Sequence, residues 1–243
     1  MRIEKDSWLI TRPIAHRGLW GNGVIENSVT AYELAAKKHY PIEIDLYKTT
    51  DDELVSFHDN TLNRMTGKDG FIYEKSLAEL KNLRLSGTNE KIPTFNEVLE
   101  IAKNRSPLLI EIKNQPDKTV VDSVVKRLKD YNGEFAVQSF NPFYINRVKK
   151  LAPEFIRGIL GNENAFGEKA INKFVVKNLS FNFLIKPDFI SYSYTGLPLP
   201  KKKTKNKVIL CWTVRDSKTE KAVKDKADNI IYENFVPEKY LND

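Results

Sequence analysis

Short runs of β-branched and aromatic residues recur along the chain, and most are separated by stretches in which apolar residues repeat at helical spacing. Strands that alternate with helices in this way form βαβ units and a parallel sheet. The sequence therefore predicts an α/β protein. The runs that predict strands are residues 13–16, 41–47, 54–58, 108–113, 135–140, 155–160, 189–194, 207–214 and 229–233.

The length and the number of these runs favour a (β/α)8 barrel. The chain has 243 residues, and such barrels commonly reach about 250 residues as one domain. Nine runs are one too many, and we expect 155–160 or 189–194 to be the surplus. The connection from Asp45 to Val55 is too short for a crossover helix and contains the turn-like Thr50-Asp51-Asp52. The prediction is a single TIM-type barrel domain over residues 1–243.

Helices are easiest to predict where apolar spacing and capping residues agree. Thr94 and Glu97 have the spacing of a capping box, and Asn141 with Pro142 opens another helix with proline at its first position. The predicted helices are residues 27–38, 94–103 and 118–128, and a short piece is expected at 76–83.

The cysteine count and the N-terminal residues indicate the cellular compartment of the protein. Cys211 is the single cysteine, so no intrachain disulfide forms and a reducing compartment fits best. Residues 1–11 carry charges and lack an apolar stretch long enough for a signal peptide or a membrane span. We expect a cytoplasmic protein without stable membrane insertion.

The net charge of +7 favours anionic partners in general. Its densest cluster is the lysine run 201–207, which either forms a patch for nucleic acid or membrane or is a solvated loop. A short run without interleaved aromatic residues favours the solvated loop. No nucleic-acid partner is expected.

Two of the three histidines, His16 and His58, stand at the C-terminal ends of predicted strands. In a barrel this is the end at which catalytic side chains lie. The alternative is that each is a hydrogen-bonded structural histidine. His39 precedes a strand and is expected at the surface.

Carboxylates two residues apart mark the strand 41–47. Glu43 and Asp45 share one face, because side chains of a strand alternate with period two. Glu111 and Lys113 have the same spacing on the strand 108–113. Three oxygen donors suit a hard divalent cation such as Mg²⁺ or Ca²⁺ better than zinc. The alternative is that Glu111 and Lys113 belong to a structural ion-pair network.

Together these residues indicate phosphoryl chemistry. A divalent ion, Arg17 and Lys113 would neutralise the negative charge of a phosphodiester. Two imidazoles would supply a general base and a general acid.

The motifs as an ordered set closely resemble the glycerophosphodiester phosphodiesterase family, in its compact, bacterial, cytoplasmic form. The family pattern is an AHRG opening, a Glu-Asn-(Ser/Thr) helix start, an ExD strand, a strand ending in HD followed by LxRxT, and an ExK strand. All are present in order between about residues 13 and 113, and QSF (138–140) and WTV (212–214) also fit.

The resemblance implies roles for individual residues. His16 and His58 would be the acid–base pair, and Glu43, Asp45 and Glu111 the ligands of one divalent cation: Mg²⁺, Ca²⁺ or Mn²⁺. Arg17 and Lys113 would hold the phosphate. Trp212 would pack against the alcohol part of the substrate, although an ordinary core tryptophan fits the position almost as well.

Supporting roles follow from the same resemblance. Asn27 would be a hydrogen-bonding group behind the site and a helix cap. Asp59, Arg64 and Thr66 would support the loop after His58, and about residues 59–93 would form a small capping insertion. After WTV the chain has Arg215 where the family often has Asn, and the ending NIIYENFVP lacks the family's usual Asp. Both departures bear on substrate preference.

The implied reaction is hydrolysis of a small-molecule glycerophosphodiester to an alcohol and sn-glycerol 3-phosphate. Two alternatives are a phospholipase-like lyase that forms a cyclic phosphate and a non-catalytic phosphoglycerol-binding module. The sequence leaves open the alcohol, the ion, the nucleophile, which histidine is the acid, and the oligomeric state.

Overall fold

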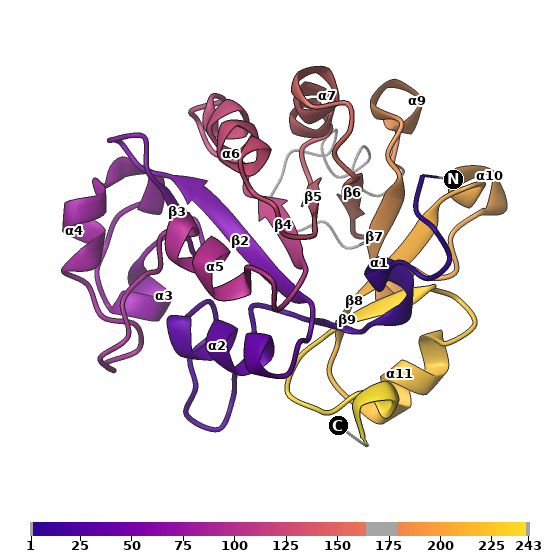
Figure 1. The fold of residues 1–243 in the computed structure, drawn as a ribbon, viewed down its shortest axis with the longest axis horizontal. Coiled ribbons are helices and arrows are strands. Elements are labelled where there is room, and N and C mark those ends of the chain that lie inside the picture. Colours follow the sequence, from indigo (N-terminus) through magenta and orange to yellow (C-terminus); the bar gives the residue numbers. More distant parts are fainter. Residues whose placement is uncertain (1, 164–178, 242–243) are drawn as a thin grey trace. The chain divides into compact units, whose positions relative to one another are not determined.

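Strands form at all nine predicted places in the computed structural model, which describes residues 2–163 and 179–241 (Figure 1). They are β1 (Ile14–Ala15), β2 (Ile42–Lys48), β3 (Leu54–Ser56), β4 (Leu108–Ile112), β5 (Phe135–Ser139), β6 (Arg157–Gly161), β7 (Phe189–Ser193), β8 (Val208–Val214) and β9 (Asn229–Tyr232).

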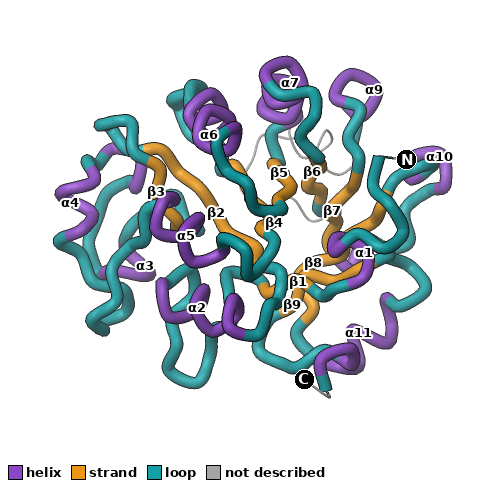
Figure 2. Tube along the Cα trace, viewed as in Figure 1, coloured by secondary structure: helices purple, strands orange, loops and turns teal. Residues whose placement is uncertain are grey.

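Helices connect most of these strands (Figure 2). The α-helices are α1 (Trp8–Thr11), α2 (Val29–Lys37), α3 (Asn63–Thr66), α4 (Leu77–Lys81), α5 (Phe95–Ala102), α6 (Val120–Lys129), α7 (Pro142–Leu151), α9 (Asn182–Ile185), α10 (Lys201–Thr204) and α11 (Ser217–Val223). Short 3-10 turns are η1 (Ile72–Glu74), η2 (Tyr194–Gly196) and η3 (Glu238–Tyr240). Parallel strands alternating with helices confirm the predicted (β/α)8 class.

The chain divides into two compact units, and each is described by itself. One is Ala15–Phe135, and the other combines Met1–Ile14 with Ala136–Asp243.

In the unit Ala15–Phe135, β2 is the central strand. It pairs in parallel with β1 through Ala15 and Ile42, and in parallel with β4. β3 pairs with β2 in antiparallel register, with Tyr47 opposite Val55. The expectation that 155–160 or 189–194 is surplus was therefore wrong, because the additional strand is β3, the returning arm of a short hairpin.

The segment 59–93 packs on this hairpin with apolar side chains of its own. Tyr47, Val55 and Phe57 from the hairpin are buried against residues of the segment: Leu62, Met65, Ile72, Leu80, Leu85 and Ile92. Their burial fixes the start of the segment next to the end of β3, where His58 lies.

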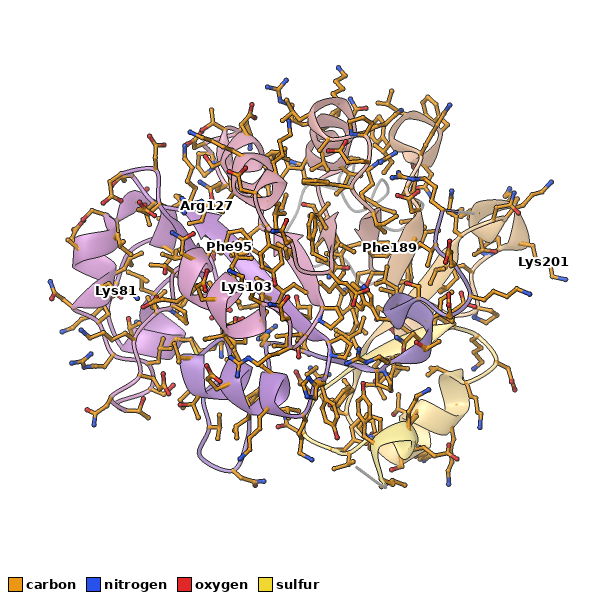
Figure 3. All side chains as sticks on the ribbon, in the orientation of Figure 1. Lys81, Phe95, Lys103, Arg127, Phe189 and Lys201 are labelled. Carbon is orange, nitrogen blue, oxygen red and sulfur yellow. The ribbon has the colours of Figure 1, made fainter. Side chains whose placement is uncertain are left out.

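Capping chemistry sets the helix starts in this unit. Thr94 and Glu97 form the predicted capping box of α5, and Ser76 with Glu79 forms another at α4. The cap of α2 is Ser28, whose hydroxyl accepts from the Ala31 N–H, so the predicted cap Asn27 is wrong by one residue. Phe95 begins α5 and lies in the interior, 1% exposed (Figure 3).

In the other unit, β5 to β9 pair consecutively and in parallel. Ile159, Ile190 and Ile209 lie level on β6, β7 and β8 and pack with Ile145 of α7 and Ile185 of α9. The predicted cap of α7 is confirmed, since the Asn141 side chain accepts from the Phe143 N–H and Pro142 follows.

The lysine run was predicted as a solvated loop, and part of it is the short helix α10, with Lys201 projecting outward (Figure 3). In the described parts of the chain, no helix has the length and apolar character needed to cross a membrane.

Candidate active site

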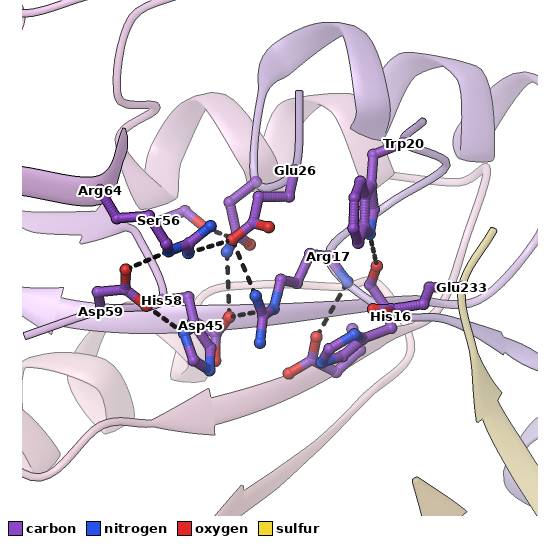
Figure 4. Close-up of polar contacts among 12 residues, drawn as sticks. His16, Arg17, Trp20, Glu26, Asp45, Ser56, His58, Asp59, Arg64 and Glu233 are labelled. Carbon is purple, nitrogen blue, oxygen red and sulfur yellow. Dashed lines mark hydrogen bonds and ion pairs between the residues drawn. The ribbon is translucent and has the colours of Figure 1, made fainter. Parts of the chain in front are cut away.

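The turn after β1 presents His16 and Arg17. Arg17 has a positive φ of 58°, and its backbone N–H donates to Glu43 Oε2 at 3.0 Å. The Trp20 indole N–H donates to the His16 carbonyl at 2.9 Å (Figure 4). Gly18 follows with φ of 83°, and a Cβ there would lie 2.8 Å from the carbonyl carbon of Ala31. The turn therefore depends on glycine to approach α2 this closely.

Three buried carboxylates lie beside this turn. Glu43 and Asp45 are 2% and 1% exposed on β2, and Glu111 is 7% exposed on β4. The parallel register places Asp45 opposite Glu111. One oxygen from each of the three lies within 4.8 Å of the others, an arrangement that could hold a metal ion. The structure thus brings together the three predicted ligands.

The electrostatics of this cluster are compatible with a bound cation. Burial, and after it the charges of Asp45 and Glu111, raises the pKa of Glu43 well above its usual range. Burial also raises the pKa of Asp45, but the charges of Lys113, His58 and Arg17 outweigh it, so the net shift is downward. Hard oxygen donors that are crowded in this way fit Mg²⁺, Ca²⁺ or Mn²⁺.

Two basic side chains flank the carboxylates. Lys113 Nζ lies 3.2 Å from Asp45 Oδ1 and 2.9 Å from Glu111 Oε1. Arg17 Nε lies 3.6 Å from Asp45 Oδ2, and its Nη1 donates to Glu26 at 2.8 Å. Burial lowers the pKa of Arg17, but Asp45, Glu26 and Glu43 together raise it, so the guanidinium stays charged.

His58 follows β3 and is oriented by the next residue. Its Nδ1 lies 2.7 Å from Asp59 Oδ1, and Arg64 Nε donates to Asp59 Oδ2. Burial raises the pKa of Asp59, but the hydrogen bonds from His58 and Arg64 outweigh it and hold the pKa low. With Nδ1 directed at a carboxylate, Nε2 is the nitrogen available for proton transfer.

A buried hydrogen-bond network that includes Asn27, Tyr32 and Ser56 holds the carboxylate of Asp45 in place. Asn27 Nδ2 donates to Asp45 Oδ2 at 3.0 Å, and the Tyr32 hydroxyl donates to Asn27 Oδ1 at 2.6 Å. The same hydroxyl lies 2.6 Å from Ser56 Oγ. Asn27 therefore has the predicted hydrogen-bonding position.

Comparison with known proteins decides the family. The model of the glycerophosphoryl diester phosphodiesterase family matches residues 16–234. The chain belongs to this family. Its members are phosphoric diester hydrolases, so the chain is an enzyme of this class.

Several relatives agree with the family match. The glycerophosphodiester phosphodiesterase of Caldanaerobacter subterraneus is 36% identical over 166 residues, which are 62% of this chain and 66% of that protein, just under two thirds of its length. The Bacillus subtilis protein YhdW is 30% identical over 222 residues, or 85% of this chain and 87% of that one.

Solved structures share the fold. An Oleispira antarctica phosphodiesterase in complex with the product sn-glycerol-3-phosphate has a TM-score of 0.77 at 24% identity, covering 92% of this chain and 93% of that one. A glycerophosphodiester phosphodiesterase from Parabacteroides distasonis has a TM-score of 0.72 at 27% identity, covering 90% and 91%.

Seven of the eight predicted site residues of this family member lie in the unit Ala15–Phe135: His16, Arg17, Glu43, Asp45, His58, Glu111 and Lys113. Trp212 belongs to the other unit. It lies within β8 and not at the strand's end. Its ring packs edge-on against the ring of Phe140, with the two ring centroids 5.7 Å apart. Its indole nitrogen is buried and has no hydrogen-bond partner in the part of the chain that the structure describes.

Three polar residues of the site were not predicted. Glu26 accepts from Arg17 and Arg64, and Tyr32 and Ser56 hold Asn27. Glu26 stands in the family's Glu-Asn-Ser helix start, which was a signal for it. Tyr32 has the spacing of an ordinary core residue on α2, so nothing in the sequence distinguished it.

Proposed function

We propose that this phosphodiesterase hydrolyses small glycerophosphodiesters to an alcohol and sn-glycerol 3-phosphate with the help of one divalent cation. The observation that carries the proposal is the cluster of Glu43, Asp45 and Glu111, whose oxygens lie within 4.8 Å of one another beside Lys113. Family membership and the product named in the Oleispira antarctica complex support the substrate class.

The three carboxylates would hold the cation, which when bound supplies positive charge to the phosphate oxygens. Arg17 would bind the phosphate through the side of its guanidinium that Glu26 does not occupy. Lys113 would add a second positive charge to the phosphate, while its contacts with Asp45 and Glu111 keep it in place.

His16 and His58 would carry the protons. One imidazole would take a proton from the nucleophile, and the other would donate a proton to the leaving alkoxide. The nucleophile is either water or the adjacent glycerol hydroxyl, and in the second case water would then open the cyclic phosphate. Asp59 fixes the ring of His58, so that Nε2 keeps one orientation throughout the reaction. Trp212 would contact the alcohol part of the substrate.

The single-domain organisation, with about residues 59–93 as a capping insertion, remains a prediction, as does the cytoplasmic location. The segment contributes six buried apolar side chains to the cluster that it shares with the β2–β3 hairpin, which supports its assignment as an insertion packed on that hairpin.

The test is release of glycerol 3-phosphate from a panel of glycerophosphodiesters, with EDTA or with added Mg²⁺, Ca²⁺ or Mn²⁺. We expect turnover that needs a divalent ion and that His16→Ala, His58→Ala and Glu43→Ala each reduce by at least about 100-fold. His39→Ala is the matched control, because His39 is exposed and its Nδ1 contacts the Arg105 carbonyl instead. It should retain full activity.

Two outcomes would contradict the proposal. A stable cyclic phosphate seen by phosphorus NMR would indicate a lyase, and binding of glycerol 3-phosphate without turnover of any diester would indicate a binding module.

A further inference from the structure

One carboxylate oxygen joins the two arginines of the site. Glu26 Oε1 accepts from Arg17 Nη1 at 2.8 Å and from Arg64 Nη2 at 2.6 Å (Figure 4). We infer that Glu26 is a positioning residue, which aims Arg17 at the substrate phosphate and couples it to His58 through the segment 59–93. The inference rests on the proposed function.

Burial strengthens the ion pair of Glu26 with Arg17 relative to an ordinary surface pair. The side chains of Glu26 and Arg17 are 9% and 13% exposed, and Arg64 is 47% exposed. Charges withdrawn from water are screened less by solvent and salt than charges on the surface. Burial by itself raises the pKa of Glu26, but the two arginines outweigh it and lower the pKa, so Glu26 is ionised.

The second contact of Arg64 extends the connection to the acid–base group. The same guanidinium that donates to Glu26 donates to Asp59, which contacts His58 Nδ1. A continuous path of polar contacts therefore runs through Arg17, Glu26, Arg64, Asp59 and His58. Arg64 lies in α3, so a short helix of the segment 59–93 orients two reactive side chains at once.

Glu26 also competes with Asp45 for the guanidinium of Arg17. Arg17 Nε is 3.6 Å from Asp45 Oδ2, an ion pair too long for a hydrogen bond. Asp45 and Glu26 exert the two largest charge attractions on this guanidinium, so loss of the Glu26 charge leaves the attraction toward Asp45 and Glu43. Arg17 would then turn toward Asp45 and compete with a cation for the carboxylate. Glu26 thus keeps Arg17 for the phosphate and Asp45 for the metal.

This arrangement predicts that Glu26→Gln weakens the binding of both the substrate and Mg²⁺. The KM for a glycerophosphodiester should rise by roughly 10-fold, and the Kd for Mg²⁺, measured by calorimetry without substrate, should rise by several-fold. Arg64→Ala should lose activity through disorder of both Glu26 and Asp59. Added guanidinium ion should restore part of that activity, whereas a purely structural role would not respond to it.

Lys81→Met is the matched control. Lys81 lies in the same segment and makes an equally short ion pair, 2.6 Å to Glu97, that does not touch the site. It should leave KM and the Mg²⁺ Kd unchanged. Arg64 is half exposed, so its variants are expected to fold, and thermal unfolding of each variant checks this.

Two results would overturn the inference. One is a Glu26→Gln enzyme whose KM and Mg²⁺ Kd stay within twofold of the wild type. The other is an Arg64→Ala enzyme that folds normally and shows no response to guanidinium. Failure of the proposed function is distinguishable, because the wild type itself would then release no glycerol 3-phosphate.

Discussion

Glu43 is the residue whose ionisation depends most on a bound cation. Burial and the neighbouring Asp45 and Glu111 raise its pKa well above the usual range, whereas the pKa of Asp45 is lowered. Of this pair, Glu43 is therefore the carboxyl that binds a proton more readily in the metal-free protein. A cation requires the ionised form, so it must expel that proton.

We predict that Mg²⁺ binding releases about one proton per site at pH values below the raised pKa of Glu43. The apparent Mg²⁺ affinity should therefore increase as pH rises toward that pKa and level off above it. Titration calorimetry in two buffers of different ionisation enthalpy counts the protons. Glu43→Gln removes both the titrating group and a proposed ligand, so under the same conditions it should show neither Mg²⁺ binding nor proton release. A count near zero in the wild type would contradict the prediction.

At this scale the sequence predicted residues that the structure brings together at the candidate site, but not the side chains that contact them from outside it. Spacing of two along a strand identified Glu43, Asp45, Glu111 and Lys113, since the face a side chain occupies follows from strand geometry. The contact of Glu26 with Arg64 joins residues 38 positions apart. Periodicity carries no information about such a contact, which depends on how the segment 59–93 folds back.

Strand direction is the element-scale feature that the sequence left open. The runs 41–47 and 54–58 were both recognised, but a period-two pattern is the same for parallel and antiparallel neighbours. The short connection was the available clue, and in the structure Thr49 and Glu53 close it with hydrogen bonds. The capping box at Thr94 was predicted correctly because its signal is local.

The packing of the Gly18 turn on α2 gives an element-scale prediction. Gly18→Ala should destabilise the protein by about 2–4 kcal/mol, since alanine is strained at this φ and its Cβ would meet the backbone of Ala31. Denaturant unfolding measures the change.

Gly23→Ala separates the effect of backbone strain from the effect of the Cβ clash with α2. Gly23 has a similar φ of 91°, but a Cβ there would meet nothing within 4 Å. Its substitution should cost only the backbone strain, about 1–2 kcal/mol. Equal losses for the two variants would mean that contact with α2 is unimportant.

For the molecule as a whole, a cation that binds only the folded state should stabilise it. At 100 times its Kd, Mg²⁺ should add about 2.7 kcal/mol to the free energy of unfolding, which for a chain of this length corresponds to a rise of about 5–10 °C in Tm. Differential scanning calorimetry with Mg²⁺ and with EDTA measures the shift.

Glu43→Gln should keep its stability without a cation and should gain none from Mg²⁺. It removes a buried, crowded carboxylate, so the metal-free variant should be at least as stable as the wild type while its Tm no longer responds to Mg²⁺. An unchanged Mg²⁺ response in this variant would place the ion elsewhere.

The confinement of seven predicted site residues to Ala15–Phe135 bears on how relatives of this enzyme could recombine. A genetic crossover near the codon for Phe135 would transmit the three carboxylates, the two histidines, Arg17 and Lys113 together. Of the predicted set, only Trp212 would come from the other parent. Lineages could therefore exchange the residue assigned to the alcohol without exchanging the hydrolytic chemistry.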